Sequence, residues 1–374
     1  MVVSYFHPFA SGAERQALAQ GAELARRGFS VRVLTRSVPG YPIDDEEHRG
    51  VQIHRWIRTS DRGPLFGVSY VASLVRALRR LRGELDVVHT HQALWEAVSA
   101  GLARPFLRGV QTLVQPASSG YYGEARELLR TRGAPLLRRA ILRNTHFAAI
   151  SDDIANEWLA LGVPPDRLSR TASGVDTEVF HPGPSAVEAE LLPRPRVVFT
   201  GRLHPQKNLP LLLNAWVEVA RRSPANLILV GPGSDRQALM DLTASLGLGD
   251  RVQFVGAVPS PAEHLRAGDL FVLPSVAEGM SNSLLEAMAS GLPCVVSGVG
   301  GNTDLVTPGS NGALVLEPTP EAWSAALLSL LRDPAEARRL GRNALARVED
   351  EFSLRAVVDR YVGLYRDLIA GARA

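Results

Sequence analysis

Short apolar runs alternate with helical segments along this chain, and the alternation stops once and then restarts. In the second half the apolar runs lie at 197–200, 227–230, 252–255, 270–273, 294–297 and 313–316, with helical patterns between them. Such alternation favours parallel strands, because a crossover between parallel strands needs the length of a helix. The sequence therefore predicts an α/β domain with a doubly wound parallel sheet in this half.

The first half shows the same alternation. Apolar runs at 2–6, 31–35, 51–56, 86–91, 110–115 and 147–151 predict strands, and 13–28, 69–81 and 124–143 predict helices. The charged segment 44–49 is interpreted as a loop. Residues 181–196 are rich in Pro, Gly and Glu, which is typical of a linker. A chain of 374 residues can hold two domains of common size, one on each side of that linker.

The composition indicates an ordinary globular protein. Apolar residues make up 45% of the chain and charged residues 21%, which excludes a disordered chain. No run reaches the roughly 18 apolar residues of a membrane-spanning helix, and no signal peptide precedes the first predicted strand. We therefore expect a cytoplasmic location. The single cysteine, Cys294, excludes an internal disulfide and a cysteine-based zinc site.

Arginines are concentrated between residues 49 and 143, where sixteen arginines stand against six acidic residues. No nucleic-acid-binding motif or interleaved aromatic series accompanies them, so we expect no nucleic acid partner. Two interpretations stay open. The arginines could face an anionic acceptor or the anionic inner face of a membrane, or they could be solvated faces of helices in a chain that uses arginine almost everywhere.

The stretch 274–306 holds the main candidate site. A loop of small and polar residues, 278–282, follows a strand, and a helix is predicted to start at Ser283. A helix N-terminus in this position offers backbone N–H groups to an anion. Two carboxylates, Glu278 and Glu286, lie on either side; for Glu286 a capping box with Ser283 is the alternative. We expect the N–H groups to bind a diphosphate and the carboxylates to bind a sugar.

Glu278 and Glu286, separated by seven residues and followed by AMASGLPCV and a GG-N-DLV turn, resemble the EX7E signature of retaining glycosyltransferases. Their surroundings resemble glycosyltransferase family 4. The match extends to Gly201-Arg202-Leu203 with Lys207-Asn208, and to the segment 175–180. In the first domain, Gly12 resembles the Gly-Gly turn of the family, with Ser11 in place of the first glycine.

The resemblance implies the GT-B fold, in which two Rossmann-like doubly wound domains face a cleft. Residues 1–182 would form the acceptor-binding domain and residues 193–352 the donor-binding domain. The C-terminal helix, 354–374, would cross back to the first domain.

Lys207 is the only lysine among 41 basic residues, which indicates that a compact cation is needed at its position. A nucleotide-sugar donor leaves as a diphosphate, on which negative charge develops. Fixed cations that stabilise developing charge usually make the largest catalytic contribution. Arg202, Lys207 and about half a charge from the helix N-terminus approach the charge of a divalent metal. We therefore expect no metal and no other cofactor.

The resemblance also implies roles for individual residues. Glu278, Arg202 and Lys207 would be catalytic, and Glu286 would hold the ribose. The remaining donor-binding residues would be Gly12, Gly231, Gly233, Val258, Ser281, Asn282, Ser283, Leu284 and Leu285, of which Leu284 and Leu285 would give N–H groups to phosphate. The acceptor side would hold His91, Gln115, Tyr121 and Tyr122, and Gln115 stands where many members carry His or Lys.

The resemblance therefore implies a retaining glycosyltransferase that moves a sugar from a nucleotide-diphosphate-sugar to a lipid-linked, polysaccharide or small-molecule acceptor. Two alternatives stay open: an epimerase of the same shape that acts on a nucleotide-sugar, and a non-catalytic subunit that binds one. An oxidoreductase is disfavoured because the glycine fingerprint of dinucleotide binding is missing. The sequence leaves the base, the sugar, the acceptor and the oligomeric state unspecified.

Overall fold

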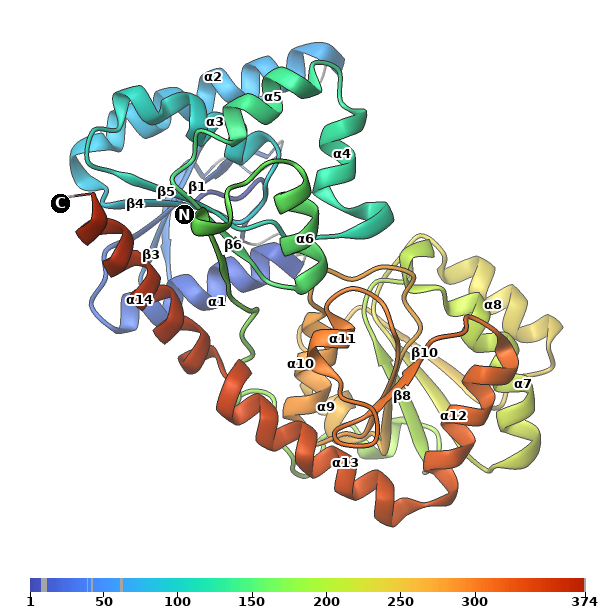
Figure 1. Ribbon diagram of the computed structural model, residues 1–374. Helices are drawn as coiled ribbons and strands as arrows, with labels where there is room; N and C mark the ends of the chain where they lie inside the picture. Colours follow the sequence, from blue (N-terminus) through green and yellow to red (C-terminus); the bar gives the residue numbers. More distant parts are fainter. Residues whose placement is uncertain (8–11, 39, 42, 61–62, 373–374) are drawn as a thin grey trace. The chain divides into compact units, whose positions relative to one another are not determined.

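The structure, a computed structural model, describes residues 1–7, 12–38, 40–41, 43–60 and 63–372. It divides into two compact units, each built on mainly parallel strands with helices (Figure 1). Unit 1 comprises Met1–Gly174 together with Leu354–Ala374, and unit 2 comprises Val175–Ser353. The predicted class of two α/β domains is confirmed.

Unit 2 holds a six-stranded parallel sheet in the order β10-β9-β8-β11-β12-β13. Its strands are β8 (Arg196–Thr200), β9 (Asn226–Val230), β10 (Val252–Gly256), β11 (Leu270–Leu273), β12 (Cys294–Ser297) and β13 (Ala313–Val315). Its helices are α7 (Leu209–Arg222), α8 (Arg236–Ser245), α9 (Ala262–Arg266), α10 (Asn282–Ala289), α11 (Asn302–Leu305), α12 (Pro320–Arg332) and α13 (Pro334–Arg347). All six predicted strands are present, because strands covered on both faces are continuous apolar runs.

The order of these strands creates one reversal. The chain runs outward from β8 to β9 and β10, then crosses back so that β11 pairs with the other side of β8. In open α/β sheets, ligands bind at the carboxyl ends of the strands on either side of such a reversal. For unit 2 this position lies between the loops that follow β8 and β11.

Unit 1 contains β1 (Val31–Arg36), β2 (Asp45–His48), β3 (Val51–Ile57), β4 (Val87–Thr90), β5 (Gln111–Val114), β6 (His146–Ala149) and β7 (Leu168–Arg170). Its helices are α1 (Gly12–Arg26), α2 (Gly63–Leu81), α3 (Trp95–Ala103), α4 (Glu124–Arg130), α5 (Ala134–Ile141), α6 (Asp152–Ala160) and α14 (Leu354–Gly371). The predicted first strand, 2–6, forms only isolated bridges: Val2 pairs with Leu34 of β1 and with Thr90 of β4. This segment therefore lies between β1 and β4.

Two further predictions for unit 1 are wrong. The charged segment 44–49 is not a loop but contains β2, which pairs antiparallel with β3 at the edge of the sheet. An edge strand can be charged because its outer face meets water. The predicted helix 124–143 is two helices, α4 and α5, separated at Gly133, whose φ of +82° ends a regular helix.

The C-terminal helix α14 belongs to unit 1, where it packs beside α1 (Figure 1). Its buried residues are Val357, Val358, Tyr361 and Val362, a spacing that places them on one face. Val358 and Val362 join the apolar core that also contains Ala17 of α1 and Val33 of β1.

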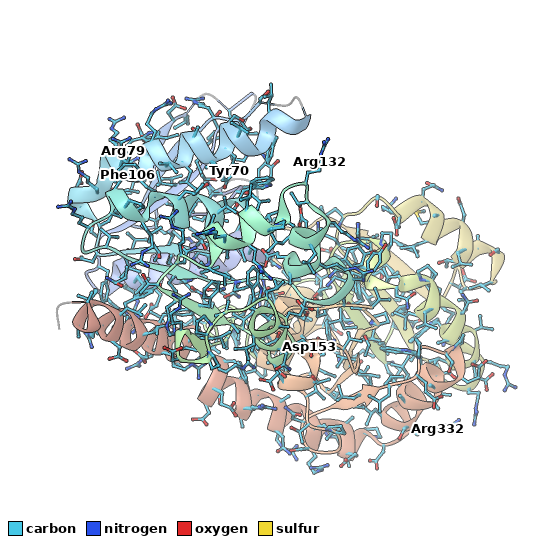
Figure 2. All side chains as sticks on the ribbon, turned by 45° about the horizontal axis from the view of Figure 1, so that its top comes forward. Tyr70, Arg79, Phe106, Arg132, Asp153 and Arg332 are labelled. Atoms are coloured by element: carbon cyan, nitrogen blue, oxygen red, sulfur yellow. The ribbon has the colours of Figure 1, made fainter. Side chains whose placement is uncertain are left out.

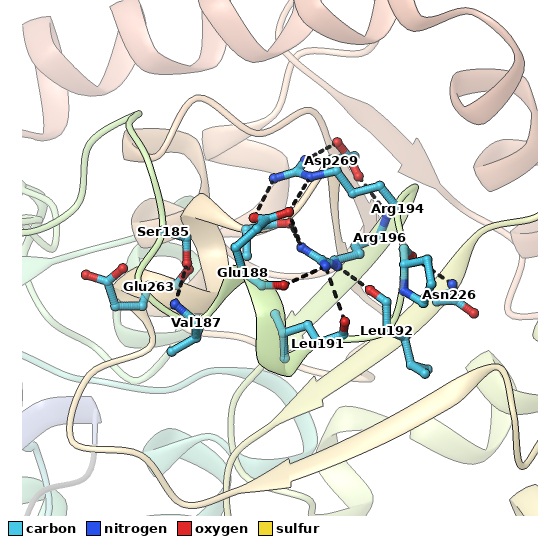
Figure 3. Close-up of polar contacts among 12 residues, drawn as sticks. Ser185, Val187, Glu188, Leu191, Leu192, Arg194, Arg196, Asn226, Glu263 and Asp269 are labelled. Carbon is cyan, nitrogen blue, oxygen red and sulfur yellow. Dashed lines mark hydrogen bonds and ion pairs between the residues drawn. The ribbon is translucent and has the colours of Figure 1, made fainter.

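The division between the units lies at Gly174 and Val175, before the linker expected from the sequence. Residues 175–182 belong to unit 2 because the Val175 N–H donates to the Phe352 carbonyl at 2.9 Å, and Arg266 donates to the Val179 carbonyl at 3.1 Å. The following segment is also tied to unit 2 (Figure 3). Within it, the buried Arg196 guanidinium donates to the carbonyls of Glu188, Leu191, Leu192 and Ala267.

Candidate active site

Lys207 and Glu278 meet at the reversal of strand order in unit 2. Lys207 ends a short 3₁₀ turn after β8, and Glu278 lies in the loop after β11. The Lys207 Nζ is 2.5 Å from the Glu278 Oε1, and the Ser275 hydroxyl donates to the same oxygen at 2.6 Å. Both side chains are largely buried, with 14% of Lys207 and 8% of Glu278 exposed. The two predicted catalytic residues therefore form a nearly buried ion pair.

The two loops that carry this pair are tied to each other by Gln206. Its carbonyl accepts from the Val276 N–H at 2.9 Å, and its side-chain amide donates to the Ala277 carbonyl at 2.9 Å. On the other side of the Glu278 loop, a Cβ on Gly300 would lie 1.8 Å from the Glu278 carbonyl oxygen. Only glycine fits such an approach, so the GG turn after β12 fixes the backbone of Glu278.

Arg202 is exposed in the loop after β8, the same loop that carries Lys207. Among the residues that the structure describes, its side chain has no hydrogen-bonding or ion-pair partner, so its N–H donors can serve a ligand. The loop is packed against the loop after β9: the Leu203 N–H donates to the Pro232 carbonyl at 2.7 Å, and a Cβ on Gly231 would lie 2.0 Å from the Gly201 carbonyl oxygen. Gly233 makes a similar approach to Leu203.

The helix of the candidate site begins one residue earlier than predicted. α10 starts at Asn282, and Ser281 is its N-cap, with its hydroxyl accepting from the Leu284 N–H at 3.3 Å. Ser283 is therefore inside the helix, and the capping box that the sequence allowed for Glu286 is wrong. The Leu285 N–H donates to the Ser281 carbonyl, so both leucine N–H groups expected to bind phosphate have acceptors within the helix turn.

The other donor-site residues lie along the same sheet edge. Glu286 and Ser283 are buried on α10, and Val258 is half-buried in the loop after the edge strand β10. The Gly231 N–H donates to the Gly256 carbonyl at 2.8 Å, which ties the loops after β9 and β10. Predicted base, phosphate and sugar residues thus follow the edge from β10 to β11.

In unit 1, His91 and Gln115 follow the neighbouring strands β4 and β5, and both are buried. Burial lowers the pKa of His91 to about 3, so the imidazole is neutral at physiological pH. His91 stacks on His89 with ring centroids 4.2 Å apart. The Gln115 Oε1 accepts from the Tyr361 hydroxyl of α14 at 2.7 Å. Gln115 therefore contacts α14 directly, and His91 stacks on His89, which itself contacts α14.

Tyr121 and Tyr122 lie in a short 3₁₀ turn before α4 and are exposed. The guanidinium groups of Arg126 and Arg130 lie 4.6 and 5.4 Å from the centre of the Tyr121 ring. This geometry is typical of cation–π contacts, so Tyr121 at least packs on the arginine-rich helix. Gly12 is the first residue of α1 and is exposed; the neighbouring Ser11 lies outside the described residues.

Sequence reasoning missed several residues that shape these sites. Ser275 and Gln206 hold Glu278 and its loop, and Tyr361 and Tyr365 of α14 contact Gln115 and His89. The two tyrosines are four residues apart, so they lie on one face of the helix, and this spacing could have indicated a polar contact there. No cluster of three or more His, Cys, Asp or Glu side chains suited to a metal ion occurs within residues 1–7, 12–38, 40–41, 43–60 and 63–372.

Comparisons with known proteins match both halves of the chain. The model described as Glycosyltransferase Family 4 matches residues 10–179, and the model described as Glycosyl transferases group 1 matches residues 194–333. The D-inositol 3-phosphate glycosyltransferase of Nocardia farcinica is 32% identical over 374 aligned residues, covering 90% of this chain and 80% of that protein. The enzyme of the same name from Frankia alni is 31% identical, covering 87% of each.

Solved structures show the same fold. Sucrose-phosphate synthase from Thermosynechococcus elongatus superposes with a TM-score of 0.82 at 27% identity, covering 97% of this chain and 94% of that one. HepE from Anabaena, solved in complex with UDP, gives a TM-score of 0.80 at 18% identity, covering 98% of each chain. These relatives favour sugar transfer over the epimerase and the binding subunit. The protein is a glycosyltransferase of the GT-B fold, and it belongs to glycosyltransferase family 4.

Proposed function

We propose that this glycosyltransferase transfers a sugar from a nucleotide-diphosphate-sugar with retention of anomeric configuration and without a metal ion. The observation that carries the proposal is the cation pair after β8, in which Arg202 is exposed and Lys207 is bound to Glu278. A lysine ammonium has three N–H donors, and Glu278 uses one of them. Two donors therefore stay available for phosphate oxygens while Glu278 fixes the direction of the ammonium.

We infer the course of the reaction from the resemblance to the family and assign these residues to it. The bond between the anomeric carbon and the diphosphate oxygen breaks, and the negative charge that develops on the diphosphate is stabilised by Lys207 and Arg202. The acceptor hydroxyl attacks the anomeric carbon from the face that the diphosphate leaves, and its proton passes to the departing phosphate. Glu278 and Ser281 would bind hydroxyls of the sugar, and Glu286 those of the ribose.

The donor side is tested with a panel of nucleotide-sugars, starting from UDP-glucose because a protein of the same fold was solved with it. Turnover of one donor with release of its nucleotide diphosphate supports the proposal. Proton NMR of the product must show the anomeric configuration of the donor, and an inverted product would overturn retention. EDTA should leave the rate unchanged, whereas loss of activity that Mg²⁺ restores would overturn metal independence.

A peripheral contact with an anionic membrane is the further partner that we propose. Leu129 of α4 and Leu136 of α5 are 62% and 75% exposed, in a segment rich in arginine that includes Arg132 (Figure 2). Basic and apolar side chains together suit an anionic lipid surface. Arg79 lies outside this segment, on α2, where it packs on the Phe106 ring with 4.4 Å to its centre (Figure 2). Within the described residues no helix has the length and apolar character to cross a membrane.

Vesicle sedimentation tests this contact. The protein should sediment with vesicles that contain anionic lipid and not with purely zwitterionic vesicles, and the double variant Leu129→Glu, Leu136→Glu should lose the interaction. Equal sedimentation of the variant would show that the contact does not use α4 and α5.

A further inference from the structure

Arg36 is the last residue of β1, at the carboxyl edge of the unit 1 sheet. Its guanidinium lies 4.8 Å from the centre of the Tyr5 ring and 5.0 Å from that of Phe66. The Nη1 donates to the Tyr5 hydroxyl at 2.5 Å, and the Nη2 donates to the Thr59 hydroxyl at 2.9 Å. Two aromatic rings and two neutral oxygens therefore fix the orientation of this cation.

Arg36 differs from its neighbours in its partners. Other arginines of this part of the chain pair with carboxylates: Arg27 with Glu23 and Asp359, Arg32 with Glu84, Arg55 with Glu46, and Arg58 with Asp44. In the part of the chain that the structure describes, Arg36 has no carboxylate partner, and its Nε is buried without an acceptor. A guanidinium that is held in place but not neutralised has N–H donors left for an anion.

A carboxylate near this end of β1 does not supply the missing charge. Glu96 is buried and accepts from the hydroxyls of Ser4 and Tyr70, the second at 2.9 Å. Burial raises the pKa of this carboxyl, which reduces its negative charge. The positive charge of Arg36 is therefore not neutralised by Glu96.

Arg36 lies at the same edge of the sheet as His91 and Gln115, the predicted acceptor residues. The segment that contains Val2 separates β1 from β4, so the ends of β1 and β4 lie two strand spacings apart, about 10 Å. His91 and Gln115 follow β4 and β5 at the same edge. A small acceptor that reaches these residues with one hydroxyl can place a second substituent against Arg36.

We propose that Arg36 binds an anionic substituent of the acceptor, a phosphate monoester, so that unit 1 selects phosphorylated small acceptors over their neutral counterparts. This inference rests on the proposed function, since it assigns the acceptor side of the same transfer. The D-inositol 3-phosphate glycosyltransferases that resemble this chain act, by their names, on a phosphorylated acceptor. Arginine suits such a group because its planar fork matches two phosphate oxygens.

The experiment measures binding to the full-length protein by calorimetry. The probes are D-inositol 3-phosphate and glucose 6-phosphate, each compared with the unphosphorylated inositol or glucose. The wild-type protein should bind at least one phosphorylated probe about 10- to 100-fold more tightly than its counterpart. The Arg36→Met variant should lose that preference, and Arg36→Lys should keep part of it because the charge stays while the fork is lost.

Arg32→Met is the matched control, because Arg32 lies on the same strand but pairs with Glu84 and Gln52. It should keep the preference for phosphate. Thermal unfolding of each variant shows whether it folds. If Arg36→Met does not fold, the comparison of Arg36→Lys with the wild type still tests the inference. The inference is overturned if the wild type shows no preference, if Arg36→Met keeps it, or if Arg32→Met loses it equally. A protein that turns over nucleotide-sugars without any such preference retains the proposed function and loses only this inference.

Discussion

Lys207 and Glu278 depend on each other, because each removes the cost of burying the other's charge. We expect Lys207→Ala and Glu278→Ala each to lower kcat by about 10²- to 10³-fold, since either change removes a fixed charge from the reacting centre. Steady-state turnover of the nucleotide-sugar measures this effect. Arg221→Ala removes an exposed ion pair with Glu218 and should leave kcat unchanged. Near-normal turnover in either site variant would contradict the assigned roles.

His91 makes the stability of unit 1 depend on pH. Burial lowers its pKa to about 3, below the value of about 6.5 in an unfolded chain. The unfolded state therefore binds more protons between these values, and stability falls as the pH drops through about 6.5. For this one group the loss between pH 7 and pH 5 is about 2 kcal/mol. Urea unfolding at both pH values should show a smaller loss for His91→Asn; an equal loss would show that His91 is not the cause.

The sequence predicted charged residues for a donor site but not the contacts between them. Lys207 and Glu278 were assigned from residue type and motif, yet they are 71 positions apart and meet only because β11 pairs with β8. Strand order is not encoded in local periodicity, so the ion pair could not be predicted. The same holds for Gln115, which bonds to Tyr361 at a separation of 246 residues.

At the scale of elements, Glu124 holds two loops of unit 1 together. From the first turn of α4 its Oε1 accepts from the Ala93 N–H at 3.1 Å, and its Oε2 accepts from the Ala117 N–H at 2.7 Å. These loops follow β4 and β5 and carry His91 and Gln115. Glu124→Gln should lower the free energy of unfolding by about 1–3 kcal/mol, because an amide has one acceptor oxygen for two buried N–H groups.

Amide hydrogen exchange checks this assignment directly. In Glu124→Gln the amides of Ala93 and Ala117 should exchange faster, while amides elsewhere in β4 keep their protection. The exposed Glu127 on the same helix is the control, and Glu127→Gln should leave both amides unchanged. Unchanged exchange in the Glu124 variant would mean that the loops are held by other contacts.

Elements were predicted best where both faces are buried. The six strands of unit 2 were found because each is an apolar run, whereas β2 was missed because its charges suit a loop as well as an edge strand. The start of α10 was uncertain for a different reason. Ser281 and Ser283 can both cap a helix, and contacts of the Glu278 loop with Gly300 and Gly301, about twenty residues away, fix the backbone before it.

The linker segment, residues 181–196, contributes to the stability of unit 2. Arg196, with 5% of its side chain exposed, donates to four backbone carbonyls and to the Glu188 carboxylate at 2.7 Å. The nearby Arg194 is 42% exposed and forms ion pairs with Glu188 and Asp269 (Figure 3). Arg196→Met should lower the free energy of unfolding of unit 2 by about 2–4 kcal/mol, because four carbonyls and the Glu188 carboxylate lose the same donor. Arg194→Met should cost less than about 1 kcal/mol. Urea unfolding measures both, and equal costs would contradict this distinction.

At the scale of the whole molecule, the last helix completes the first unit. Val358 and Val362 of α14 fill the core formed by α1, β1 and β3, so unit 1 contains both ends of the described chain.

Val358→Asp should destabilise unit 1 by more than about 3 kcal/mol, because it removes apolar burial and buries a charge. Hydrogen exchange read by peptides should then show loss of protection within residues 12–174. Peptides from 175–353 should keep theirs, because unit 2 has its own core. Arg366→Ala, at an exposed position of the same helix, should change neither. Equal loss in both units would show that they unfold as one cooperative body.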